Sequence, residues 1–112
     1  LSRATVLGLE IKITSTMNAL KEELQTSDKP VFKIIQKAES FKVIAIGLNT
    51  GVILKKHKAP ARAKLVIVQG SVDYCSERET ATLNQLDEYN IPLDEFHELV
   101  AHEASICMLI VG

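Results

Sequence analysis

The stretch "GVILKKHKAPARAKLVIVQG" (Gly51–Gly70) contains two short β-type runs with a break between them. The runs "VILKKHK" and "AKLVIVQG" are rich in Val, Ile and Leu, and the segment "APAR" separates them. β-Branched residues in short runs that are bounded by Gly or Pro are typical of strands joined by a turn. The stretch therefore predicts a pair of strands.

The chain after residue 30 repeats this pattern. Further β-rich runs are "KPVFKIIQK", "SFKVIAIGL", "SVDYC", "TATLNQL", "EYNIP" and "ASICMLIVG", with Gly, Pro or polar turns between them. Short strands at this spacing in one small domain predict an antiparallel sandwich or barrel. The run "SFKVIAIGL" is apolar on both faces, which suits a strand that is packed on each side or buried in a subunit contact.

The first 27 residues differ from the rest. "EIKITST" (Glu10–Thr16) alternates apolar and polar residues as a half-buried strand does, and "NALKEELQ" places Leu20 and Leu24 on one face of a short helix. We therefore expect residues 1–27 to form an N-terminal extension with a strand and a short helix, and residues 28–112 to form the main domain.

Length and composition indicate one globular domain. The chain has 112 residues, of which 46% are hydrophobic and 24% charged, enough for a single apolar core. No apolar stretch approaches the ~20 residues of a membrane span, and the first residues lack the apolar centre of a secretory signal, so we expect a cytoplasmic protein without a membrane partner. Cys75 and Cys107 lie inside strand-like runs and are predicted to be buried free thiols.

Charge is distributed unevenly along the chain. Up to Lys64 there are twelve basic and five acidic residues, a balance of about +7, and after it one basic and nine acidic residues, a balance of about −8. These halves can attract each other within one chain or across a dimer. The basic segment "KKHKAPARAK" contains no aromatic residue, so a nucleic-acid partner is not expected.

The order of landmarks from Gly51 to Gly70 resembles the first conserved motif of the cupin superfamily. That motif reads Gly, five residues, His, one residue, His, three or four residues, Glu, six residues, Gly. Gly51, His57 and Gly70 match it, whereas Ala59 stands at the second histidine and Ala63 at the glutamate.

The segment "IPLDEFHELVAHEASICMLIV" resembles the second cupin motif, which reads Pro, one residue, Gly, two residues, His, with an asparagine further on. Pro92 and His97 match, while Asp94 replaces the glycine and Ala101 the asparagine. Leu86 also takes a place that is usually glycine. Because a turn that needs a positive φ resists leucine, we expect the turn near Leu86 to differ from the family's shape.

The resemblance covers residues 28–112 and implies an all-β, RmlC-like jelly roll with a short N-terminal helix. It also implies a homodimer, in which a partner covers an exposed apolar strand such as "VIAIGL". In cupins the two histidines and the glutamate of the first motif and the histidine of the second bind one divalent metal inside the barrel. By resemblance, His57 and His97 lie in that cavity, and two of the four ligand positions are alanine.

Several functions are compatible with this reading. The leading hypothesis is a cupin that binds a small molecule in the barrel, with His57, His97 and Lys64 as contacts and a weakly held zinc, iron, manganese or nickel ion as an optional cofactor. The alternative is a metal-dependent enzyme, dioxygenase- or isomerase-like, whose third and fourth ligands lie outside the motifs, because catalytic sites normally use three protein ligands. A third is a purely structural dimer with a filled barrel.

Overall fold

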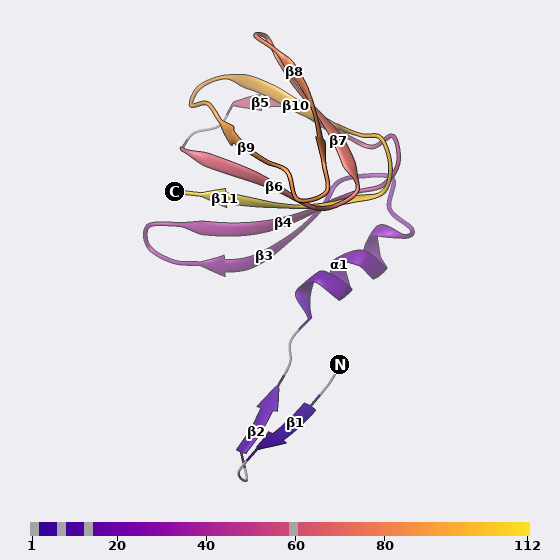
Figure 1. Cartoon of the computed structure of the whole chain (residues 1–112), viewed down its shortest axis with the longest axis vertical. Helices are drawn as coiled ribbons and strands as arrows, with labels where there is room; N and C mark the ends of the chain where they lie inside the picture. Colours follow the sequence, from indigo (N-terminus) through magenta and orange to yellow (C-terminus); the bar gives the residue numbers. More distant parts are fainter. Residues whose placement is uncertain (1–2, 7–8, 13–14, 59–60) are drawn as a thin grey trace.

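The computed structural model describes residues 3–6, 9–12, 15–58 and 61–112; for residues 3–6, 9–12, 56 and 57 the description is limited to the backbone. Within these ranges one helix, α1 (Thr16–Leu24), precedes a long series of strands (Figure 1). The strands are β1 (Arg3–Val6), β2 (Leu9–Lys12), β3 (Val31–Lys37), β4 (Lys42–Leu48), β5 (Ile53–Lys58), β6 (Ala63–Gln69), β7 (Ser71–Ser76), β8 (Thr80–Asn84), β9 (Glu88–Ile91), β10 (Phe96–Ala101) and β11 (Ser105–Val111).

Two antiparallel sheets form the body of the protein. One has the strand order β5-β10-β7-β8 and the other β3-β4-β11-β6-β9, and Figure 1 shows them facing each other. Strands that are distant in the sequence are neighbours in both sheets, as β10 is to β5 and β11 is to β4. The prediction of an all-β, antiparallel jelly roll with a short helix is confirmed.

The core lies between the two sheets. The five-stranded sheet contributes alternate residues of β4, β6 and β11, and the four-stranded sheet contributes alternate residues of β7 and β10. This period of two is what a half-buried strand requires. The buried members of this core are Ile46, Leu48, Leu65, Ile67, Val72, Tyr74, Leu83, Ile91, Leu99, Ala101 and Cys107.

Helix α1 covers the outer face of the five-stranded sheet. Leu20 and Leu24, the predicted apolar face, are buried in a second cluster with Ala45 and Ile106. The expectation that "VIAIGL" forms an exposed strand for a partner to cover is wrong, because Ala45 to Leu48 are buried within the chain. The exposed apolar strand is instead β3, at the edge of the sheet.

The start of the chain only partly follows its prediction. The strand expected over Glu10–Thr16 is observed as Leu9–Lys12, in a two-stranded sheet with β1. Thr16 already belongs to the helix, whose N-cap is Ser15, and residues 13 and 14 lie outside the described residues.

Two turns carry residues with positive φ where the resemblance has glycine. Leu86 has φ 71° and Asp94 has φ 59°. The expectation of an altered turn at Leu86 is wrong, because the backbone takes the left-handed conformation despite the side chain. Hydrogen bonds between the turn and β6 hold it there: the Leu86 amide donates to the Ile67 carbonyl at 2.7 Å, and the Ile67 amide donates to the Asp87 carbonyl at 2.9 Å.

Other predictions about single residues can be compared with the structure. Cys75 and Cys107 are free thiols; Cys107 is buried, whereas Cys75 is only partly covered. Burial raises the pKa of the Cys107 thiol to about 12, so this thiol stays protonated and inert. In the described part of the chain no helix is long and apolar enough to cross a membrane.

Candidate functional site

His97 lies inside the barrel on β10. Its side chain is only 4% exposed, and its ring stacks on that of Tyr74, with centroids 5.3 Å apart and planes 19° from parallel. The Nδ1 atom lies 3.2 Å from the carbonyl oxygen of Glu95. Because a carbonyl only accepts, Nδ1 is the donor in this contact and carries a proton.

The strand register brings position 57 across from position 97. The Cα atoms of His57 and His97 are direct partners in the β5–β10 ladder, and Leu54 pairs with Leu99 after a register shift. The shift gives β5 one extra residue between these two pairs, a β-bulge. Residues directly opposite each other on an antiparallel ladder are neighbours on one face. The backbone therefore brings together the two histidine positions that the motifs predicted, although the His57 side chain lies outside the described residues.

The remaining motif positions do not complete a cupin metal site. Ala63 starts β6 and packs its methyl group against the core, and Ala59 lies outside the described residues. Nowhere in the described ranges do three or more His, Cys, Asp or Glu side chains gather closely enough to hold an ion. Two imidazole positions are fewer than the three protein ligands of a catalytic zinc or iron site, so the described donor set does not fit the family's metal.

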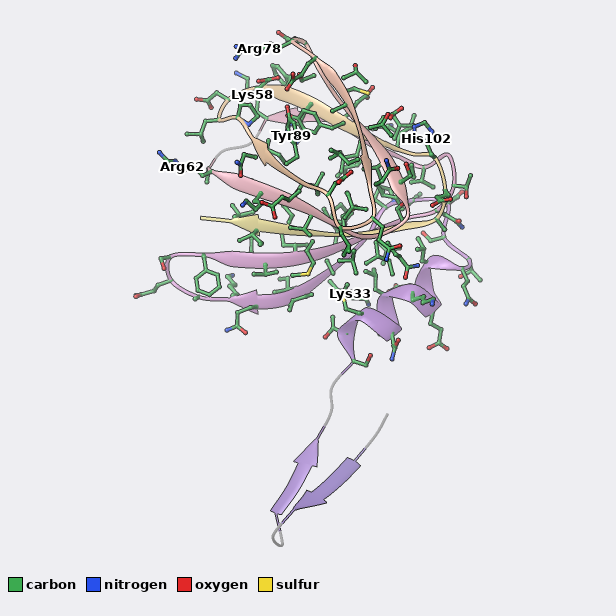
Figure 2. The ribbon with its side chains drawn as sticks, in the orientation of Figure 1. Lys33, Lys58, Arg62, Arg78, Tyr89 and His102 are labelled. Carbon is green, nitrogen blue, oxygen red and sulfur yellow. The ribbon has the colours of Figure 1, made fainter. Side chains whose placement is uncertain are left out.

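Lys64 and His102 lie away from this interior. Lys64 is on the outer face of the five-stranded sheet, where its Nζ lies 3.1 Å from the Glu88 carboxylate. His102 is exposed at the surface (Figure 2), and its Nε2 lies 2.8 Å from the Asp73 carboxylate. The structure does not bring Lys64 together with His97.

Tyr74 is the feature of the interior that the sequence analysis missed. Its side chain is completely buried, and its hydroxyl oxygen has no hydrogen-bond partner among the residues that the structure describes. A buried hydroxyl without a partner costs about 1–3 kcal/mol, and such a group in a native protein calls for an explanation, such as local strain, a functional role or a bound water or ion. Burial is the main cause that raises the Tyr74 pKa to about 12, with the charges of Glu95 and Glu79 adding to it.

Tyr89 on β9 continues this aromatic group. Its ring lies 4.5 Å from that of Tyr74, and its hydroxyl donates to the Glu79 carboxylate. Burial is the largest cause that raises the pKa of Tyr89, and the hydrogen bond with Glu79 is the next largest. Glu79 belongs to the turn between β7 and β8, which the sequence indicated only as a polar turn. Because Tyr89 lies on β9 in the opposite sheet, its hydrogen bond to Glu79 connects the two sheets at one end of the barrel, which we call the polar end.

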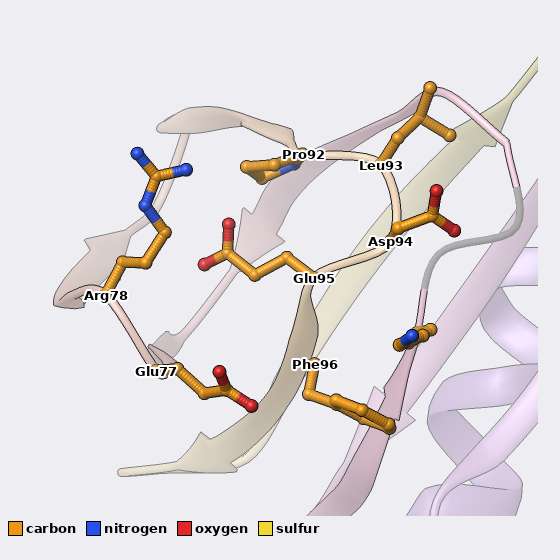
Figure 3. A pocket seen from close by; sticks show the side chains of 8 residues that line it. Glu77, Arg78, Pro92, Leu93, Asp94, Glu95 and Phe96 are labelled. Carbon is orange, nitrogen blue, oxygen red and sulfur yellow. The ribbon is translucent and has the colours of Figure 1, made fainter.

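A hollow opens at this end, between the β7–β8 turn and the β9–β10 loop (Figure 3). Its volume is about 410 Å³. The lining residues are Lys58, Glu77, Arg78, Pro92, Leu93, Asp94, Glu95 and Phe96. Glu95 connects the hollow with the interior, because its side chain lines the hollow while its carbonyl contacts His97.

Comparison with solved structures identifies the architecture. An RmlC-like cupin from Shewanella frigidimarina superposes with a TM-score of 0.70 at 13% identity, over 77% of this chain and 78% of that one. The chain has a cupin fold. A conserved protein of unknown function from Streptococcus pyogenes superposes on this cupin fold with a TM-score of 0.69 at 21% identity, over 76% of this chain and 75% of that one.

KdgF from Halomonas sp. shares the cupin fold as well, with a TM-score of 0.66 and 19% identity over 77% of this chain and 81% of that one. No protein-family model matches the sequence, and no curated protein matches it significantly. At these identities the comparisons establish the cupin fold and leave the activity to be argued from the site.

Proposed function

We propose that this cupin-fold domain binds a small organic molecule at the polar end of its barrel and does so without a metal ion. The observation that carries the proposal is the Tyr74 hydroxyl, which is buried, protonated at neutral pH and without a partner. A ligand atom that hydrogen-bonds to this oxygen removes the cost of leaving it unpaired. His97, stacked on the same ring, supplies a second polar group.

The surroundings favour a small ligand with one polar end. Deeper in the barrel the packing is aliphatic, because Leu65, Ile67, Val72 and Leu99 belong to the buried core. Polar groups are concentrated at the mouth of the barrel, which lies between the β7–β8 turn and the β9–β10 loop. There Glu79 accepts a hydrogen bond from Tyr89, and Glu95 lines the hollow. Pockets that combine apolar walls with a few convergent polar groups are typical binding sites.

The ligand needs a movement of the mouth to reach Tyr74, because the side chain is completely buried. The β7–β8 turn is the segment that we expect to move, and a hydrogen bond from the Tyr89 hydroxyl to Glu79 connects it to β9. Breaking one hydrogen bond between mostly exposed groups costs about 1 kcal/mol, which thermal motion supplies readily.

The register between His57 and His97 supports a second candidate, a divalent metal held weakly by the two imidazoles as in a metal-dependent cupin enzyme. Zinc, iron, manganese and nickel all bind imidazole nitrogen. This candidate needs at least one more protein donor, and Ala63 offers only a methyl group. We therefore rank it below metal-independent binding.

A thermal-shift screen in the presence of EDTA tests the proposal. A small molecule that raises the melting temperature of the wild-type protein in EDTA, and fails to raise that of the Tyr74→Phe variant, supports binding at this hydroxyl. If stabilising compounds act only when a divalent metal is added, and His57→Ala with His97→Ala removes the effect, the metal-dependent candidate replaces the proposal.

We also propose that the protein is a homodimer in the cytoplasm. The β3 edge supports the dimer, because Phe32 and Ile34 are 53% and 60% exposed on a strand without an outer neighbour. Unpaired edge strands with apolar side chains readily pair with another chain. The unpaired thiols of Cys75 and Cys107 suit a reducing compartment.

A further inference from the structure

The hollow between the β7–β8 turn and the β9–β10 loop carries charges of both signs. Its volume of about 410 Å³ falls within the range of small-molecule sites, which is roughly 300–1,000 Å³. Tyr74 is not among the residues that line it, so the hollow is a different site from the one proposed above. The charged lining residues are Lys58, Glu77, Arg78, Asp94 and Glu95.

Arg78 and Glu95 are the opposite charges that face each other. Figure 3 shows the Arg78 guanidinium, at the tip of the β7–β8 turn, and the Glu95 carboxylate, from the β9–β10 loop, directed into the same space beside Pro92. The two groups do not meet, because within the described ranges neither side chain takes part in an ion pair. A guanidinium and a carboxylate thus lie on opposite sides of an open part of the hollow.

The other charges of the hollow are directed elsewhere. The Lys58 ammonium lies 4.9 Å from the centroid of the Phe96 ring. In Figure 3 the Glu77 carboxylate is directed toward Phe96, and the Asp94 carboxylate is directed away from Arg78. Arg78 and Glu95 are therefore the pair that a ligand in this space would meet.

From this arrangement we propose that the hollow binds a small zwitterion, in the simplest case an α-amino acid, with its carboxylate on Arg78 and its ammonium group on Glu95. A guanidinium presents its N–H donors in a planar fork that matches a carboxylate, and a glutamate carboxylate accepts from an ammonium group. Charge-assisted hydrogen bonds of this kind are roughly twice as strong as neutral ones. A ligand with a single charge would pair with one of the two groups and leave the other unpaired.

The apolar part of the lining favours a zwitterion with an aliphatic side chain. Leu93 and Phe96 are 50% and 39% exposed, and both line the hollow together with Pro92. A ligand side chain that covers them removes apolar surface from water, which stabilises the complex. Leucine is therefore a better probe than glycine. The inference makes no use of the Tyr74 hydroxyl and goes beyond the proposed function.

Leucine and two molecules that each lack one of its charges test the inference. 3-Methylbutylamine is leucine without the carboxylate, and 4-methylpentanoate is leucine without the ammonium group. Each is titrated at pH 7 and constant ionic strength, and the backbone amide resonances of residues 93–96 are followed by NMR. The expected result is that leucine shifts these resonances and binds at least tenfold more tightly than either of the other two.

Variants attribute each charge of the ligand to one residue. Arg78→Gln is expected to weaken the binding of leucine and 4-methylpentanoate roughly tenfold, the effect of losing one charge-assisted hydrogen bond, and to leave 3-methylbutylamine unaffected. Glu95→Gln is expected to weaken leucine and 3-methylbutylamine and to leave 4-methylpentanoate unaffected. Arg62→Gln and Glu22→Gln are the matched controls, because both residues are exposed and neither lines the hollow.

The results distinguish this inference from the proposed function. If either singly charged molecule binds as tightly as leucine, or if the control variants weaken leucine as much as Arg78→Gln and Glu95→Gln do, the zwitterion site is wrong. If leucine shifts the ring resonances of Tyr74 and leaves those of residues 93–96 unchanged, the inference is wrong and the proposed function is supported. If none of the three molecules shifts residues 93–96, the inference is contradicted, and binding at Tyr74 is unaffected by that result.

Discussion

Replacing Tyr74 with phenylalanine removes the unpartnered hydroxyl and nothing else. The ring keeps its contacts with Tyr89 and His97, and no hydrogen bond is lost because the hydroxyl makes none with the part of the chain that the structure describes. A buried polar group without a partner costs about 1–3 kcal/mol, so Tyr74→Phe is expected to raise the free energy of unfolding of the ligand-free protein by about that amount. For a domain of this size, that corresponds to an increase of roughly 4–12 °C in melting temperature.

The assay is urea and thermal unfolding followed by circular dichroism, on protein that was unfolded and refolded to remove any ligand. Tyr89→Phe is the matched control, because it removes the same hydroxyl from a neighbouring ring. That hydroxyl donates to Glu79, so its loss is expected to lower the free energy of unfolding by about 0.5–1.5 kcal/mol. The same chemical change thus has opposite signs at two adjacent tyrosines.

The opposite result would be that Tyr74→Phe destabilises the ligand-free protein as much as Tyr89→Phe does. In that case the Tyr74 hydroxyl has a hydrogen-bond partner such as an ordered water, and it does not indicate a ligand-binding site.

Three further predictions concern a turn, an ion pair and the sheet edge. Leu86→Gly is expected to stabilise the fold by about 0.5–1 kcal/mol in urea unfolding, because glycine accepts the positive φ without strain, whereas Leu93→Gly, at an ordinary φ, is expected to destabilise it. Hydrogen bonds from Thr82 and then His102 lower the pKa of Asp73 below 3.8, so these bonds stabilise the folded protein fully above pH 3.8, and this stabilisation is lost as the pH falls through the folded pKa. The difference in free energy of unfolding between wild type and Asp73→Asn should therefore shrink in acid, and a difference that grows would contradict this. Phe32→Glu is expected to convert a dimer to a monomer in light scattering, and an unchanged mass would exclude β3 as the contact.

The sequence predicted the fold well because the relevant signals are local. Alternating apolar residues separated by Gly and Pro define most strands, and Leu20 and Leu24 define the inner face of α1. The two motifs also predicted that positions 57 and 97 meet, because each histidine has a fixed place in its motif. The same approach was wrong about "VIAIGL", since the spacing of apolar residues shows that a strand is covered without showing what covers it.

The candidate site was less predictable because it depends on tertiary contacts. Tyr74 alternates with Val72 on one face of β7, which is a signal for an inward position. Nothing in the sequence indicates that its hydroxyl lacks a partner, since that property depends on every group around it. Glu79 likewise reads as an ordinary polar turn residue until the fold places Tyr89 beside it. At Leu86 the turn is imposed by hydrogen bonds to β6, which local preferences cannot predict.

The proposed function requires that the barrel holds a small molecule at Tyr74 without a metal ion. A native mass spectrum of the protein purified without chelators, recorded beside that of Tyr74→Phe, tests it most directly. We expect an organic adduct on the wild-type chain that is weakened or absent in the variant, and no metal in stoichiometric amount. A stoichiometric metal ion that disappears with His57→Ala and His97→Ala, with no organic adduct, would contradict it.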